Sequence, residues 1–169
     1  MIYENFQKSL LITMLYFIVK YLKRQFPDVK NITVTDLKAK VDNKEDILII
    51  DTRTAEEYNV SFIPEAKHLS YKSSEAEVEE FLAENQAERR DLIVCYCSLG
   101  YRSSVLAQNI RSYNRDLQVD VCNLEGSIFQ WVNSDFSVEN PSGDTVHCAH
   151  PFNYMWGILG LRYSRWRWQ

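Results

Sequence analysis

The chain has 169 residues, of which 46% are hydrophobic and 25% are charged, and its formal net charge is −4. This balance is typical of one globular domain with extensions, and the acidic charge excludes nucleic acid as an expected partner. The cysteines are too few for a disulfide scaffold, and their spacing matches no metal site, so we expect no bound metal, free thiols and a reducing, cytoplasmic location. They are Cys95, Cys97, Cys122 and Cys148.

The N-terminal segment is strongly apolar but short for a membrane span. The run Ser9–Val19 has about half of the roughly 20 apolar residues that a spanning helix needs, and Lys20 and Arg24 follow it. We predict a helix over residues 4–25 with a wide apolar face. This face is expected to pack on the chain's own body or on a partner, and the alternative is a membrane-surface anchor through residues 9–24. Its rows contain Leu10, Leu11, Met14, Leu15, Phe17, Ile18 and Leu22.

Strand-like and helical patterns alternate through the middle of the chain. Continuous aliphatic runs predict buried strands at 46–51 and 91–97. Shorter strands are predicted from Ile32, at 66–71 and at 117–126. Helices are predicted at 35–40 with Thr35 as the cap, 54–62, 73–86, 103–114 and 127–134. This alternation predicts an α/β fold with a mainly parallel sheet.

The segment from Pro141 to the C-terminus has a different composition. It is rich in aromatic residues, carries Arg162, Arg165 and Arg167, and has no acidic residue after Asp144. We predict that it contains no sheet element. It is expected to wrap back over the domain, to cover the N-terminal helix or to lie in a homodimer interface, and peripheral membrane contact is the alternative.

The stretch "YCSLGYRSS" (96–104) places a cysteine, a glycine and an arginine directly after a predicted strand. Cys97 ends that strand, and open α/β sheets bind ligands beyond the carboxyl ends of their strands. Turn amides and the start of the next helix favour an anion there and lower the pKa of a thiol. Gly100 permits a positive φ, and Arg102 has a forked donor set that matches an oxyanion. The order predicts an anion cradle with a nucleophile at its base.

Five segments together resemble the single-domain rhodanese-like sulfurtransferases. They are "ITVTDLKAKV" (32–41), "LIIDTRTAEEY" (48–58), "FIPEAKHL" (62–69), "VCYCSLGYRSSVLA" (94–107) and "NLEGSIFQWV" (123–132). The resemblance implies a five-stranded, mostly parallel sheet flanked by helices. We place this domain at 29–138, between an apolar helical extension (1–28) and an aromatic, basic extension (139–169). Ser61-Phe62 and Gly126-Ser127 depart from the family's usual pattern, which suggests a divergent member.

The resemblance also implies a reaction. Cys97 would attack the outer sulfur of a small anionic donor such as thiosulfate, and the resulting persulfide would pass its sulfur to cyanide, a thiol or a protein acceptor. Arg102 would orient the donor, and the loop amides would hold the anion. The loop residues concerned are Ser98, Leu99, Gly100, Tyr101 and Ser103. A thiolate of lowered pKa needs no general base, so we expect no cofactor and only structural or surface roles for the histidines.

Two supporting residues and two alternatives complete the hypothesis. Asp51 and Arg53 are expected to play a structural part near the loop, and Cys95 is expected to be a buried, inert thiol, with a resolving thiol as its alternative. The spacing from Cys97 to Arg102 is C-x4-R, whereas the loops of phosphatases and arsenate reductases of this fold have the longer pattern C-x5-R. The shorter loop favours sulfur chemistry over these alternatives. The other alternative is a non-catalytic binding module recruited to a membrane or a protein partner, against which the intact cysteine argues.

Overall fold

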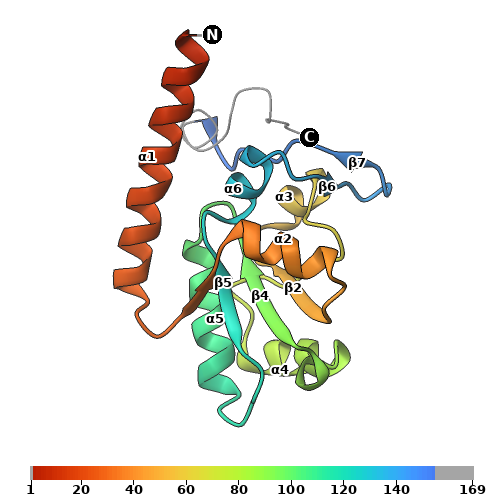
Figure 1. The fold of residues 1–169 in the computed structure, drawn as a ribbon. Coiled ribbons are helices and arrows are strands. Elements are labelled where there is room, and N and C mark those ends of the chain that lie inside the picture. The colour runs from red at the N-terminus through yellow and green to blue at the C-terminus, as the bar shows by residue number, and fades with distance from the viewer. Residues whose placement is uncertain (1, 155–169) are drawn as a thin grey trace.

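The computed structural model describes residues 2–154, and within α1 it describes the side chains from Thr13 onward (Figure 1). The helices are α1 (Ile2–Gln25), α2 (Val34–Asp42), α3 (Ala55–Val60), α4 (Glu75–Glu84), the 3-10 helix η1 (Ala87–Arg89), α5 (Tyr101–Tyr113) and α6 (Ser127–Asn133). The strands are β1 (Lys30–Ile32), β2 (Ile47–Asp51), β3 (Lys67–His68), β4 (Leu92–Tyr96), β5 (Val121–Leu124), β6 (Val138–Glu139) and β7 (Thr145–Val146).

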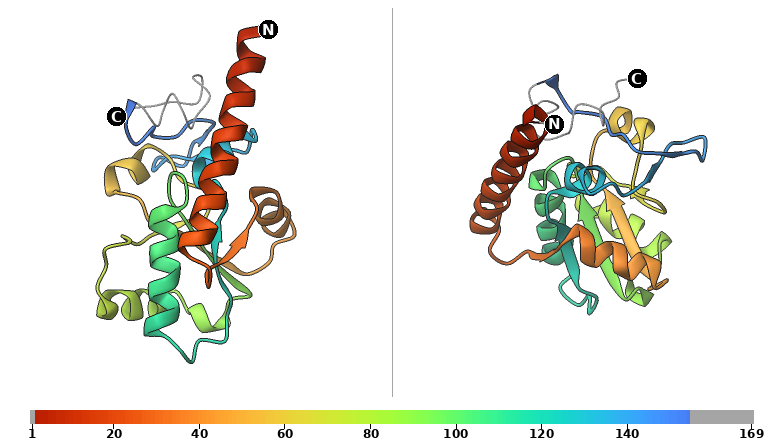
Figure 2. Two further views of the ribbon diagram at one scale, coloured as in Figure 1. Left: turned by 90° about the vertical axis from the view of Figure 1, so that its left-hand side faces the viewer. Right: turned by 45° about the horizontal axis from the view of Figure 1, so that its top comes forward.

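Strands β1 to β5 form one parallel sheet in the order β1-β5-β4-β2-β3. Helices α2 and α6 share one hydrophobic cluster with the sheet, and α4 and α5 share the other, so the sheet is covered on both faces (Figures 1 and 2). This confirms the predicted α/β class and the five-stranded sheet. Because all five strands are parallel, their carboxyl ends meet at one edge of the sheet.

The central strand β4 explains why its sequence is a continuous apolar run. Val94 and Tyr96 belong to the cluster with α2 and α6, whereas Ile93 and Cys95 belong to the cluster with α4 and α5. Successive side chains of a strand face opposite sides, so a strand covered on both faces buries every residue. Trp131 of α6 is also buried in the cluster with α2 and α6.

The start of α2 differs from the prediction. Thr33, not Thr35, is the N-cap, because its backbone is extended (φ −78°, ψ 158°) and its hydroxyl accepts a hydrogen bond from the N–H of Asp36 at 3.1 Å. Two threonines in the run "TVT" are equally good caps by residue type. The helix starts at the one where the chain leaves strand β1.

The start of α5 also differs, and this change moves a candidate site residue. The helix begins at Tyr101, two residues earlier than the predicted Ser103, because Gly100 has φ +121° and turns the chain directly into the helix. Arg102 therefore lies in the first helical turn rather than in the loop. The predicted strands at 66–71 and 117–126 shorten to β3 and β5.

The prediction that no sheet element follows Pro141 is wrong. Strand β6 pairs antiparallel with β7, which lies inside the segment predicted to lack strands. The Asn140 side chain accepts backbone N–H bonds within the connecting turn, and Gly143 has φ +83°, so the turn closes tightly enough for a hairpin. Strand β6 spans the boundary expected between residues 138 and 139. The expectations for the aromatic run 156–168 fall outside the described residues.

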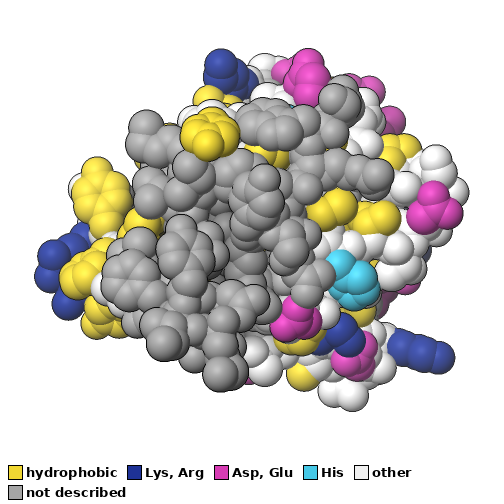
Figure 3. Space-filling model, turned by 90° about the horizontal axis from the view of Figure 1, so that it is seen from above, with side chains coloured by type: hydrophobic (Ala, Val, Ile, Leu, Met, Phe, Trp, Pro, Cys, Tyr) yellow, Lys and Arg dark blue, Asp and Glu magenta, His cyan; other side chains and the backbone are white. Residues whose placement is uncertain are grey.

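Helix α1 packs on the body of the chain beside α5 (Figures 1 and 2). Leu15 and Leu22 are buried, and Lys23 forms an ion pair with Glu125. Phe17, which the sequence places on the same apolar face, is 61% exposed and does not pack on the body of the chain. Hydrophobic and basic side chains gather together over α1 in Figure 3. No helix in the described part of the chain is both long and apolar enough to cross a membrane.

Candidate active site

Cys97 lies at the carboxyl edge of the sheet, where the loops after β2, β4 and β5 meet. The N–H of Thr52, after β2, donates to the Tyr96 carbonyl at the end of β4 over 2.9 Å. The N–H of Ile128, after β5, donates to the Cys97 carbonyl over 3.1 Å. The backbone on both sides of the cysteine is therefore fixed by the neighbouring loops, and the predicted position at the strand end is observed.

The thiol of Cys97 is held in the cradle of its own loop. Its side chain is buried, with 2% of the residue exposed, and the sulfur accepts a hydrogen bond from the Gly100 N–H at 3.0 Å. The N–H of Cys97 donates to the Ser127 hydroxyl at 3.1 Å. Ser127 begins α6 with φ +52° and was not anticipated from the sequence. The cradle is thus completed by a residue that follows β5.

The surroundings of Cys97 favour its thiolate. Burial by itself raises the pKa of this thiol, but the charge of Arg102 and the backbone N–H bonds of Ser103 and Gly100 outweigh burial, so the pKa lies below the usual value for cysteine. Positive charge and N–H donors stabilise the charged form of a thiol, and the thiolate is its nucleophilic form. The site therefore favours the charged form of the Cys97 thiol.

Arg102 is ion-paired with the carboxylate of Glu57, which lies in the first turn of α3. Its two terminal nitrogens lie 2.7 and 2.8 Å from the two oxygens of Glu57, and the second also contacts the Ser98 hydroxyl at 2.9 Å. Ser98 donates in turn to Glu57 at 2.9 Å. Burial raises the pKa of Glu57, but Arg102 and the neighbouring Arg53 lower it to about 2. Arg102 is therefore a charged residue of the site whose two terminal nitrogens are already bonded to Glu57 and Ser98.

The sequence does carry a signal for Glu57. Thr54 and Glu57 form a capping box at the start of α3, in which each side chain accepts the other's backbone N–H. The pattern T-x-x-E directly after β2 thus places a carboxylate in the first turn of a helix at the sheet edge. What the pattern cannot give is that this carboxylate faces the loop from Cys97 to Arg102.

Asp51 and Arg53 form a buried layer beneath the cysteine loop. Their side chains are fully buried and are joined by an ion pair of 2.7 Å. The Tyr96 hydroxyl donates to Asp51 at 2.7 Å, and Arg53 also donates to the Ser61 carbonyl at 2.5 Å. His68 donates from Nε2 to the Arg53 carbonyl at 2.8 Å. These contacts tie the ends of β2, β4 and β3 together and support the loop from below.

The remaining loop residues differ in exposure. Leu99 is half-buried against the core, whereas Tyr101 is exposed and meets the Phe26 ring edge-on at 5.7 Å. The Ser103 hydroxyl donates to Asn123 at 2.7 Å, so a second side chain from β5, also not anticipated, reaches the loop. The loop is therefore anchored on one side by β5 and bordered on the other by Phe26, the residue that follows α1.

The other cysteines lie apart from this chemistry. Cys95 is fully buried, and burial raises its pKa, so its thiol stays protonated. Cys122 is buried in the core, and Cys148 is half-buried. All are free thiols. Within the described residues, no group of three or more histidine, cysteine and acidic side chains is placed to hold a metal ion.

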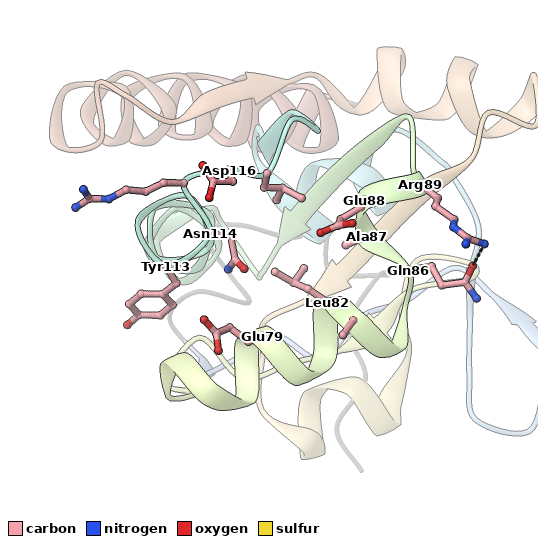
Figure 4. A pocket seen from close by; sticks show the side chains of 12 residues that line it. Glu79, Leu82, Gln86, Ala87, Glu88, Arg89, Tyr113, Asn114 and Asp116 are labelled. Atoms are coloured by element: carbon pink, nitrogen blue, oxygen red, sulfur yellow. Dashed lines mark hydrogen bonds between the residues drawn. The ribbon is translucent and has the colours of Figure 1, made fainter.

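A cavity of about 710 Å³ lies away from Cys97, between α4, η1 and the end of α5 (Figure 4). Glu79 and Tyr113 come from facing helices, and Asp116 and Arg89 lie at opposite sides of the opening (Figure 4). Its lining contains none of the candidate site residues. This cavity is therefore separate from the cysteine loop.

Comparison with known proteins places this geometry in a family. Residues 33–134 match the family described as rhodanese-like domain. No curated protein sequence matches the chain. Solved structures of the same fold include an arsenic–antimony reductase from Leishmania major, which is 19% identical with a TM-score of 0.58 over 70% of this chain and 92% of that chain.

Two further structures of this fold have different described activities. A thiosulfate sulfurtransferase from Pseudomonas aeruginosa is 18% identical, with a TM-score of 0.56 over 80% of this chain and 24% of that chain. A protein from Rhodopseudomonas palustris described as a possible tyrosine phosphatase is 18% identical, with a TM-score of 0.54 over 74% of this chain and 93% of that chain. At these identities the likeness shows a shared fold, and the reaction must be argued from the site.

Proposed function

The chain belongs to the rhodanese-like domain family, and from this premise we propose that it is a sulfurtransferase that carries sulfane sulfur on Cys97. The observation that carries the proposal is the placement of the Cys97 sulfur, which accepts the Gly100 N–H at 3.0 Å beside the charged Arg102. A thiolate in a cradle of N–H donors is suited to attack an electrophilic sulfur and to stabilise the persulfide that results.

The first half-reaction loads the cysteine. The Cys97 thiolate forms a bond to the outer sulfur of thiosulfate, the S–S bond of the donor breaks, and sulfite leaves with the electron pair. The loop amides from Ser98 to Ser103 would hold the terminal sulfur of the persulfide, which carries the negative charge. Arg102 supports this state through its charge, which also stabilises the starting thiolate.

The second half-reaction transfers the sulfur from the Cys97 persulfide to an acceptor. A thiol or cyanide attacks the terminal sulfur, and the Cys97 thiolate leaves and is ready for another donor. Asp51 and Arg53 support the loop through their buried ion pair and take no direct part. The cycle needs a reduced Cys97, which suits a reducing compartment. We infer that the extensions 1–28 and 139–169 present the domain to a protein acceptor, a second copy or a membrane surface.

A mass measurement tests the proposal. The intact chain is incubated with thiosulfate, and we expect a gain of ~32 Da, one sulfur atom, on the peptide that contains Cys97. Treatment with cyanide should remove this mass and release thiocyanate. Cys97→Ser should show neither result, and Cys122→Ser is the control for nonspecific sulfuration. Absence of the added sulfur in the unchanged chain, or its persistence in Cys97→Ser, would reject the proposal.

Arsenate reduction and phosphate ester hydrolysis, the alternative reactions, are tested in parallel with sulfur transfer. Solved structures of this fold include a described arsenic–antimony reductase and a described possible phosphatase, so arsenate and a generic phosphate ester are assayed with the same preparation. We expect no turnover of arsenate or of the phosphate ester. The C-x4-R loop of this chain is one residue shorter than the C-x5-R pattern of phosphatases and arsenate reductases of this fold. For a non-catalytic binding module, Cys97→Ser would leave partner binding intact and there would be no turnover to lose.

A further inference from the structure

The segment that follows β7 is fixed to the body of the chain beside the cysteine loop. The Ser61 hydroxyl donates to the Cys148 carbonyl at 2.7 Å, and the next residue, Ala149, is fully buried in the cluster with α2 and α6. The preceding hairpin is also attached, because Phe62 and Glu139 exchange two backbone hydrogen bonds of 2.8 Å. The segment up to Ala149 is therefore fixed to the domain by hydrogen bonds and burial, and the residues after it extend from this fixed point toward the cysteine loop.

The chain then makes a strained turn at Phe152. This residue has φ +64°, a left-handed backbone conformation that is unfavourable for a residue with a side chain. The N–H of Phe152 donates to Nδ1 of His150 at 3.0 Å, and the N–H of Asn153 donates to the Pro151 carbonyl at 2.7 Å. The second bond closes a three-residue turn, which is rare in this left-handed form. These hydrogen bonds hold Phe152 in its unfavourable backbone conformation and fix the direction of its side chain.

The turn places the Phe152 ring on the active-site arginine. The centre of the ring lies 5.0 Å from the central carbon of the Arg102 guanidinium. The terminal nitrogens of Arg102 are occupied by Glu57 and Ser98, so the ring covers a part of the guanidinium that those partners leave open. Phe152 itself is 45% exposed, so part of its surface faces the solvent beside the site.

We propose that Phe152 determines which sulfur donors the site accepts, by offering its ring to the organic group of a donor held near Arg102. This inference rests on the proposed sulfurtransferase function. In a thiosulfonate, R–SO2–S⁻, the Cys97 thiolate bonds to the outer sulfur, the S–S bond breaks, and the sulfinate R–SO2⁻ leaves with the electron pair. The outer sulfur enters the cradle while R lies beyond the sulfonyl group, where an aromatic R can pack on the Phe152 ring. Thiosulfate has no such group and gains nothing from the ring.

The proposed role of Phe152 is tested by the selectivity of the site between an aromatic and an aliphatic thiosulfonate. The rates of Cys97 persulfide formation are compared for benzenethiosulfonate and methanethiosulfonate in single-turnover reactions followed by mass spectrometry. Phe152→Ala should lower the benzene-to-methane ratio of second-order rate constants by about fivefold, as expected for one aromatic contact. Phe152→Tyr keeps the ring and should keep the ratio. Phe17→Ala removes an exposed phenylalanine from α1 and is the matched control.

The outcomes separate the two proposals. Persulfide formation with an unchanged ratio in Phe152→Ala would overturn the role of Phe152 and leave the sulfurtransferase function standing. No persulfide on the unchanged chain with any donor would overturn both. A fall in the rate with both donors to the same extent would also overturn the inference, because a ring that only supports Arg102 has no reason to distinguish the two substituents.

Discussion

The N–H of Gly100 donates to the Cys97 sulfur over 3.0 Å, and Gly100 reaches this position with φ +121°. A residue with a side chain rarely adopts that backbone conformation. A Cβ atom added at Gly100 would also lie 3.0 Å from a methyl group of Leu22 in α1. The hydrogen bond that supports the thiolate therefore depends on the absence of a side chain at one residue.

Gly100→Ala should impair both stability and thiolate formation. Strain at a positive φ is expected to lower the free energy of unfolding by about 1–3 kcal/mol, and loss of the N–H bond should raise the pKa of Cys97. Urea unfolding and the pH dependence of iodoacetamide alkylation measure the two effects. Gly143→Ala is the control, since Gly143 has φ +83° with open space around it. The control should lose stability only, and an unchanged alkylation profile in Gly100→Ala would contradict the role of this bond.

Removal of the charge of Arg102 should raise the pKa of Cys97. A positive group beside the sulfur favours the thiolate, so Arg102→Gln is expected to shift the alkylation midpoint to higher pH. Arg111→Gln removes an arginine of the same helix whose partner is the exposed Asp120, and it should leave the midpoint in place. Equal midpoints for Arg102→Gln and the unchanged chain would show that the loop amides suffice.

The ion pair between Glu57 and Arg102 should make stability depend on acid. The pKa of Glu57 is about 2 in the folded chain and near 4.5 when unfolded, so its contribution is complete above about pH 4.5 and is lost as the pH falls toward 2. Glu57→Gln leaves Arg102 without its partner and should cost about 3 kcal/mol at pH 7.

The pH series for this variant provides its own control. Urea unfolding at pH 7, 4.5 and 3 should show the gap between the unchanged chain and Glu57→Gln narrowing only below about pH 4.5, because only the unchanged chain gains a proton at this site. Glu45→Gln changes a carboxylate that pairs with Lys40 at the surface, and little effect is expected. A gap that stays constant down to pH 3 would mean that Glu57 stabilises the fold by packing alone.

Ser127 combines a hydrogen bond with an unfavourable backbone, and two substitutions separate these effects. Ser127→Ala leaves the buried N–H of Cys97 without its acceptor and should cost about 1–3 kcal/mol. Ser127→Gly loses the same acceptor but relieves φ +52°, so it should be about 1 kcal/mol more stable than the alanine variant. Thermal unfolding of both variants measures the difference. If the alanine variant is the more stable one, backbone strain at Ser127 is not significant.

The sheet was predictable because its signals are local. The run Ile47–Asp51 and the run Leu92–Tyr96 are apolar throughout, as strands covered on both faces must be. The same locality predicted the order of Cys97, Gly100 and Arg102, since all three lie on one short segment.

The rest of the site was not predictable because it depends on contacts between distant segments. Ser127 and Asn123 reach the loop only because β5 lies next to β4 in the sheet, which no local pattern specifies. The pairing of Glu57 with Arg102 likewise depends on how α3 is placed against α5. The missed strand β7 has only two residues, too few for a periodic pattern to be recognised.

The order of strands also affects the protein during its synthesis. Strand β5 separates β4 from β1, and its Cys122 pairs with Lys30, so the sheet is incomplete until the ribosome has delivered residues beyond Leu124. Cys97 emerges earlier, before Ser127 and Ile128 are available to hold its backbone. In the nascent chain Gly100, Arg102 and Ser103 follow Cys97 within a few residues, but the hydrogen bonds from Ser127 and Ile128 that fix its backbone form only after α6 has been synthesised.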